Sequence, residues 1–110
     1  MASKFEVKRA ANGFMFNLKA SNGQIILTSE IYVDKKGAKK GIASVQKNSQ
    51  IDSRYEMRTT TSGDPYLVLL AANKEVIGKS ETYKSSRSCK NCINSVKKNA
   101  PEAQIVDLTE

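Results

Sequence analysis

The chain has 110 residues, 39% of them hydrophobic and 26% charged, a composition typical of a globular domain rather than a disordered chain. No apolar run approaches the roughly 18 residues of a membrane-spanning helix, and the first residues lack the apolar core of a signal peptide, so we expect a cytoplasmic protein with no membrane partner. Eighteen Lys and Arg against 11 Asp and Glu give a net charge of +7, and the absence of histidine removes the usual general base and the commonest transition-metal ligand.

The first half of the chain predicts three strands. Apolar and polar residues alternate through 4–8 and again through 14–20, as in half-buried strands. Asn22-Gly23 then predicts a hairpin turn into a third strand at 25–27, because both residue types tolerate a positive φ. After a helix, the short stretch 50–52 is expected to close this unit as a further strand.

The second half of the chain repeats this order. Residues 54–58 alternate like 4–8, and Ser62-Gly63 marks a turn. Asn73-Lys74 is a weaker version of the hairpin signal before the strand at 76–77. The tail at 103–108 predicts a closing strand.

A helix is predicted in each half, near 35–48 and near 86–99. Asp34 and Ser85 are the predicted N-caps, and Pro101 follows the end of the second helix. Small and apolar residues fall on one stripe of each helix, at Ala38, Gly41, Ile42 and Val45 in the first and at Cys89, Cys92, Ile93 and Val96 in the second.

The two halves are copies of one unit. At an offset of 51, nine of the twenty residues in 29–48 are identical to their counterparts in 80–99, where about one match is expected by chance. No Pro- or Ser-rich linker separates the copies, so we predict a single domain over 1–110 made of repeats at about 3–52 and 53–108. The predicted fold class is α+β: two tandem β-β-β-α-β repeats form one mostly antiparallel sheet, with both helices on one face and a pseudo-two-fold axis.

The motifs Ser29-Glu30-x-Tyr32 and Gly41-Ile42-x-Ser44-Val45-x-x-Asn48, with their copies at 80–83 and 93–99, resemble the YegP-like family of small bacterial proteins. The resemblance covers both repeats. It implies a single sheet whose units exchange their last strands, with dimers expected for members that carry one unit. The family has no established biochemical function, so the resemblance implies no catalytic, binding or cofactor residues. The second copy departs from the pattern by placing Cys92 where the first has Gly41.

Cys89-Lys90-Asn91-Cys92 is the motif with the most obvious chemistry. A C-x-x-C at a helix start can carry thiol–disulfide exchange when the helix lowers a thiol pKa. The two cysteines align with Ala38 and Gly41 on the apolar stripe, however, so we expect reduced thiols packed in the core. Zinc normally takes four ligands, and neither a second Cys pair nor a His supplies the others.

Basic residues occupy the helix faces opposite the apolar stripes. These faces are a candidate surface for nucleic-acid phosphates, and an ordinary solvated helix face is the alternative. Neither the paired strand aromatics of an RNA-recognition module nor a Gly-rich clamp loop accompanies them. The candidate phosphate contacts are Lys36, Lys40, Lys47, Arg87 and Lys98.

Two further features have structural and functional interpretations. The repeated Ser-Glu-x-Tyr motif is interpreted as a structural corner rather than a catalytic pair, because the sequence indicates neither the third group nor the pocket that a catalytic pair needs. Tyr66, Val68 and Leu70 replace the more polar Met15, Asn17 and Lys19 on the face away from the helices. This apolar patch either marks an interface or is covered by the neighbouring strands and the tail. We expect a monomer, because both repeats lie in one chain, or at most a weak dimer that pairs through Tyr66, Val68 and Leu70.

The sequence favours a non-enzymatic interaction module that needs no cofactor or metal, with its partner undetermined. Two alternatives stay open. One is weak, sequence-nonspecific nucleic-acid binding through the basic helix faces, and the other is thiol–disulfide exchange at Cys89 and Cys92.

Overall fold

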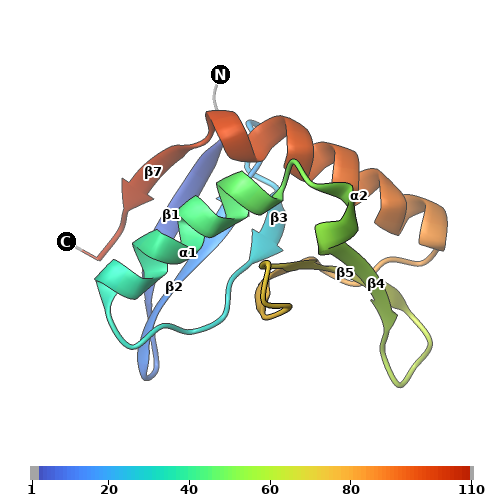
Figure 1. The fold of residues 1–110 in the computed structure, drawn as a ribbon, viewed down its shortest axis with the longest axis horizontal. Helices are drawn as coiled ribbons and strands as arrows, with labels where there is room; N and C mark the ends of the chain where they lie inside the picture. The colour runs from blue at the N-terminus through green and yellow to red at the C-terminus, as the bar shows by residue number, and fades with distance from the viewer. Residues whose placement is uncertain (1–2, 110) are drawn as a thin grey trace.

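The computed structural model describes residues 3–109, which form one seven-stranded sheet covered on one face by two helices (Figure 1). The first repeat contributes β1 (Lys4–Ala10), β2 (Gly13–Lys19), β3 (Ile25–Thr28) and α1 (Lys35–Asn48). The second repeat contributes β4 (Tyr55–Thr59), β5 (Pro65–Leu70), β6 (Val76–Lys79), α2 (Ser86–Asn99) and β7 (Gln104–Asp107). Short 3-10 helices lie at Asp52–Arg54 and Ala100–Glu102. Within residues 3–109, neither helix is long and apolar enough to cross a membrane.

The sheet has the predicted pseudo-two-fold symmetry. Its strand order, β4-β5-β6-β3-β2-β1-β7, places the two repeats back to back, with the antiparallel β3–β6 pair at the seam. The residues paired there, Thr28 and Lys79, are themselves 51 positions apart. The sheet is antiparallel except for the β1–β7 pair, which is parallel.

Both helices begin and end where the sequence predicts. The side chain of Asp34 accepts a hydrogen bond from Gly37 N at 2.7 Å, and that of Ser85 accepts one from Ser88 N at 3.2 Å. The apolar stripes of the helices lie on the sheet and close one core. Its largest fully buried members include Phe5, Phe16, Leu18, Ile42, Leu67, Leu69 and Val96.

The closing strands of the two repeats behave differently. β7 leaves the second repeat and pairs with β1 of the first, which is the strand exchange that the family resemblance implies. The predicted strand at 50–52 is wrong, because the chain forms a 3-10 turn at Asp52–Arg54 and enters β4 directly. A closing strand at 50–52 that matched β7 would pair parallel with β4, as β7 does with β1. Two parallel strands need a connection of a dozen or more residues, but only six residues separate α1 from β4.

The β2–β3 and β5–β6 hairpins use one turn geometry. In the first, Ala20 N donates to Gln24 O and Gly23 N donates to Ala20 O, both at 2.9 Å, and Gly23 has a φ of 86°. Asn22 does not take a positive φ, and instead its Oδ1 accepts from Gln24 N. The second hairpin repeats this arrangement with Lys74 at a φ of 70°. The substitution of Lys for Gly explains why its sequence signal is weaker.

Candidate functional site

The helix layer concentrates the positive charge of the protein. α1 and α2 together carry nine of the chain's 18 Lys and Arg and none of its 11 Asp and Glu. The helices therefore bear +9, and the remaining residues together bear −2. Because both helices cover the same face of the sheet, this charge lies on one side of the molecule (Figure 1).

All five predicted phosphate contacts are exposed on this layer. Lys36, Lys40 and Lys47 lie on α1, opposite its buried stripe, and Arg87 and Lys98 hold the corresponding side of α2. At a rise of about 1.5 Å per residue, Lys36 and Lys47 stand about 16 Å apart along the helix axis. The three lysines of α1 thus form a row that follows the axis.

Most cations of the layer have no acidic partner within residues 3–109. In the described part of the chain, Lys35 pairs with Asp107 at 3.0 Å and Lys97 pairs with Asp52. No carboxylate of residues 3–109 lies within ion-pair distance of the other seven, which are all exposed. These seven are Lys36, Lys39, Lys40, Lys47, Arg87, Lys90 and Lys98.

Two of these cations, Lys39 and Lys90, fall outside the predicted set. Lys39 lies with Lys35, Lys36 and Lys40 around a shallow hollow of about 520 Å³ on α1. The sequence feature that could have identified them is the absence of acidic residues from both helices. The prediction considered only which residues point away from the apolar stripe, and that criterion takes no account of missing acidic residues.

The two helices are tied together at their C-terminal ends. Gln50 Nε2 donates to Lys97 O at 3.0 Å, and Gln46 Nε2 donates to Ala100 O at 3.4 Å. Lys47, Lys97 and Lys98 therefore lie where two helix C-termini approach, and their charges complement the partial negative charge of the terminal carbonyls. Hydrogen bonds thus link the C-terminal ends of the two helices.

The cysteines are buried, as predicted. Cys89 is fully buried, and Cys92 is nearly so, with its Sγ 3.9 Å from Ile26 O. Burial raises the pKa of both thiols, which disfavours the thiolate needed for exchange. No group of three or more acidic or cysteine side chains in residues 3–109 is placed to hold a metal ion.

The Ser-Glu-x-Tyr motifs form structural corners, which confirms their interpretation. Ser29 Oγ accepts from Phe16 N at 2.9 Å and donates to Glu30 O at 2.7 Å, while the Tyr32 ring stacks on Phe16 with 6.2 Å between ring centroids. Ser80 makes the equivalent bonds to Leu67 N and Glu81 O, both at 2.8 Å. Both hydroxyls are committed to the backbone, so neither is poised as a nucleophile.

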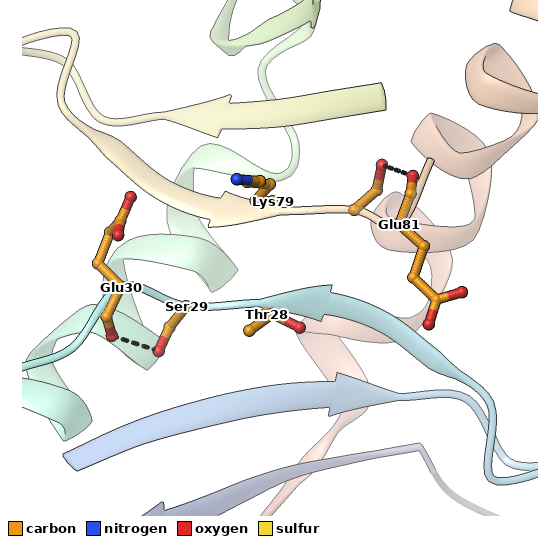
Figure 2. Close-up of a pocket in the computed structure, with 6 residues that line it drawn as sticks. Thr28, Ser29, Glu30, Lys79 and Glu81 are labelled. Carbon is orange, nitrogen blue, oxygen red and sulfur yellow. Dashed lines mark hydrogen bonds between the residues drawn. The ribbon is translucent and has the colours of Figure 1, made fainter. Parts of the chain in front are cut away.

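A small pocket of about 250 Å³ lies between these corners, at the β3–β6 seam. Figure 2 shows Thr28 and Lys79 in the middle of the pocket, with Glu30 at one end and Glu81 at the other. The two carboxylates do not converge on a common point. The seam therefore lacks the arrangement that a carboxylate pair needs for acid–base chemistry.

The face away from the helices differs from the expected apolar patch. Val68 is 1% exposed, and Tyr66 and Leu70 are half-buried, with Lys79 Nζ lying 5.4 Å from the centre of the Tyr66 ring. Val68 is flanked across the strands by Glu56 and Lys79, and long polar side chains of this kind cover apolar surface with their stems. Of the two alternatives that the sequence left open for this patch, cover by the neighbouring strands holds for Val68.

A buried carboxylate organises the opposite end of the same face. Glu6 lies with Lys19 at 2.8 Å, Lys4 at 3.3 Å and Lys8 at 3.7 Å. The contact with Lys19 is the largest of the influences that hold the pKa of Glu6 below its usual value. The lysines of this cluster pair with a carboxylate of the same chain, in contrast to most cations of the helix layer.

The model of a protein family described as a domain of unknown function, DUF1508, matches the chain twice, over residues 10–56 and 61–107. The chain belongs to the DUF1508 family. The two matches begin 51 residues apart, which is the offset of the repeat read from the sequence, and the resemblance to YegP-like proteins is confirmed.

Curated relatives match the tandem DUF1508 chain over nearly its full length. The UPF0339 protein YegP of Yersinia pestis is 54% identical over 106 residues, which cover 96% of this chain and 95% of its own. A UPF0339 protein of Acinetobacter baylyi is 49% identical over 110 residues, covering 99% of each chain. These names assign no activity.

Two solution NMR structures share the fold. The protein of unknown function YegP from E. coli has a TM-score of 0.92 and 45% identity, covering 99% of this chain and 95% of its own. A UPF0339 protein from Shewanella oneidensis has a TM-score of 0.90 and 44% identity, covering 99% and 93%. The single α+β sheet built from two DUF1508 repeats is thus the family fold.

Proposed function

We propose that the protein is a non-catalytic module that binds nucleic acid without sequence specificity, through the phosphate backbone and the basic helix layer. The observation that carries the proposal is the segregation of charge: +9 on α1 and α2 against −2 on the rest of the chain. A solvated helix of a globular protein usually mixes both signs, and acidic partners within the molecule would neutralise its lysines. Seven exposed cations without such partners favour an external polyanion.

The chemistry of the remaining surface supports a binding role over an enzymatic one. The chain has no histidine, its thiols are buried, and both corner serines bond the backbone. The helix layer also carries no aromatic residue, so bases have no stacking platform there. We therefore expect contacts to phosphates alone and a preference for duplex over single strands, because duplex has the higher charge density.

Nonspecific contacts of this kind give dissociation constants of about 10⁻⁴ to 10⁻⁶ M at physiological salt. If the four unpaired lysines of α1 engage duplex DNA, the log–log salt slope is about −3.6, and affinity falls about 150-fold between 50 and 200 mM salt. Engagement of all seven cations steepens the slope to about −6. Fluorescence anisotropy with a labelled duplex measures both quantities.

A pair of matched variants locates the surface. Lys36→Gln/Lys40→Gln should lower the magnitude of the slope by about two and weaken all sequences alike. Lys8→Gln/Lys79→Gln removes the same charge from the open face of the sheet and should leave the slope unchanged. Equal weakening by both pairs would show that binding is not confined to the helix layer. No anisotropy change at about 100 μM protein and 50 mM salt would refute nucleic-acid binding altogether.

A further inference from the structure

The outer edge of β4 is not covered by another strand of residues 3–109. β4 and β7 lie at the two ends of the sheet (Figure 1). In the first repeat, the edge of β1 is covered by β7, and the carbonyl of Val7 accepts from Leu108 N at 2.9 Å. Met57 is the counterpart of Val7 in the second repeat. Among the described residues no strand covers this edge of β4, because residues 52–54 form the 3-10 turn.

The backbone groups that face this edge follow from the bonds on the other side of β5. Leu67 N donates to Ser80 Oγ, Leu67 O accepts from Ser80 N, and Pro65 O accepts from Tyr83 N, so Leu67 and Pro65 face β6. The backbone groups of Tyr66 and Val68 therefore face β4. Because orientation alternates along an antiparallel pair, Glu56 and Arg58 point their backbone groups at β5.

The free edge is therefore formed by the three alternate residues of β4, namely Tyr55, Met57 and Thr59. The N–H of Tyr55 already donates to Asp52 O. The groups left for a new strand are the N–H and C=O of Met57, the N–H and C=O of Thr59 and the C=O of Tyr55.

We propose that β4 pairs antiparallel with β4 of a second copy of this chain, with Met57 opposite Met57 on the two-fold axis. This register makes four intermolecular hydrogen bonds: two between the Met57 backbones, and one from each Thr59 N–H to the partner's Tyr55 C=O. The N–H of Tyr55, which is already occupied, is not needed for any of them.

Charge selects this register over its neighbours. With Met57 on the axis, Glu56 of each copy lies opposite Arg58 of the other on the open face, so two opposite-charge pairs form. A two-fold axis at Glu56 or at Arg58 would place like charges opposite each other, which disfavours pairing. Both side chains are exposed, and within one chain Glu56 and Arg58 already pair with each other. In the dimer, the two such pairs would lie side by side, with each charge next to opposite charges.

The dimer has a consequence for the helix layers. A two-fold axis perpendicular to the sheet keeps the same face up in both copies, so all four helices lie on one side of a continuous sheet. Pairing through a five-residue edge strand gives a weak association, and it places two basic helix layers side by side.

Sedimentation velocity on the full chain, without nucleic acid, tests the proposal between about 10 μM and 1 mM in low salt. The wild type should show a concentration-dependent dimer. Glu56→Arg and Arg58→Glu should each weaken it at least about tenfold, because each puts like charges opposite each other. An equimolar mixture of the two variants should form a heterodimer, since every facing pair is then opposite in charge. The double exchange Glu56→Arg/Arg58→Glu should restore the homodimer.

Glu75→Arg and Lys84→Glu, which reverse exposed charges away from the edge, are the matched controls and should leave the dimer intact. Thermal unfolding establishes that each variant is folded. A wild type that stays monomeric up to 1 mM, a dimer that survives both single reversals, or a mixture that fails to associate would each overturn the proposal. All of these readouts are independent of nucleic-acid binding.

Discussion

The contact between Gly41 and the Tyr32 ring gives a sharp test of how the first repeat packs. A Cβ on Gly41 would lie 2.7 Å from Tyr32 Cζ, closer still to Tyr32 Oη, and 3.0 Å from Phe16 Cε2. Tyr32 cannot swing away freely, because its ring stacks on Phe16 and its backbone exchanges hydrogen bonds with Phe14 at 2.7 and 2.8 Å. Gly41→Ala therefore forces the ring out of its place.

Two effects of opposite sign determine how much Gly41→Ala changes the free energy of unfolding. Overpacking of this kind costs about 1–3 kcal/mol, whereas replacing Gly by Ala inside a helix gains about 1 kcal/mol. We expect Gly41→Ala to destabilise the protein by about 1 kcal/mol and to lower Tm by about 4 °C. In a Tyr32→Ala background the ring is absent and Phe16 can relax, so the same substitution should stabilise by about 1 kcal/mol. The coupling free energy is then about 2 kcal/mol.

Urea unfolding of the four proteins of this double-mutant cycle measures the coupling, with the m-value as a check that the unfolded states are comparable. Ala43→Gly, at an exposed position of the same helix, calibrates the propensity difference and should cost about 1 kcal/mol. The reasoning is refuted if Gly41→Ala stabilises the wild type, or if it has the same sign and size in both backgrounds.

Three further predictions concern buried groups. Cys89 and Cys92 should react with a thiol reagent at least about 100-fold more slowly in the folded protein than in urea, and rapid native labelling would revive thiol exchange. The lysines lower the pKa of Glu6 from its usual value of 4.5, so its stabilising effect is present above about pH 4.5 and lost as pH falls through the lowered pKa. The Tm difference between wild type and Glu6→Gln should shrink from pH 7 to pH 3, and a constant difference would contradict this. Ser29→Ala and Ser80→Ala should each lower the unfolding free energy by about 1–3 kcal/mol, because a buried amide loses its acceptor; a loss under 0.5 kcal/mol in urea unfolding would contradict it.

The repeat and the helices were predictable because their signals are local. Asp34 and Ser85 cap helices whose stripes recur every three or four residues, and these features lie within one segment of chain. The offset of 51 then supplied the symmetry of the sheet without any knowledge of strand pairing. A duplicated sequence supplies two independent readings of each element, which strengthens a weak signal such as Asn73-Lys74.

The error at 50–52 and the undecided alternatives at Val68 arose where chain connectivity or register decides the outcome. The stretch 50–52 resembles the start of a closing strand, but six residues between α1 and β4 leave no room for a parallel strand and its return. Val68 is apolar on the open face, yet it is covered because its register places Glu56 and Lys79 beside it. Neither the missing strand at 50–52 nor the cover of Val68 can be predicted from the local pattern of residues.

The residues that are identical in the two repeats can be sorted by whether the structure explains why both copies keep them. Most of the identical pairs have a visible structural reason: Ser29 and Ser80 bond the backbone of the neighbouring strand, and Asn48 and Asn99 donate to the carbonyls of Ser44 and Ser95.

The pair Lys39/Lys90 has no such reason, whereas Lys47 and Lys98 also complement the carbonyls at the C-terminal ends of their helices. All four lysines are exposed and lack an ion-pair partner within residues 3–109. Exchange of a solvated surface residue costs little stability, so two copies that have diverged at Gly41/Cys92 and Asn17/Val68 have no structural reason to keep the same cation at Lys39 and Lys90. Its retention there supports the proposed phosphate contacts, because each such contact contributes through its charge alone.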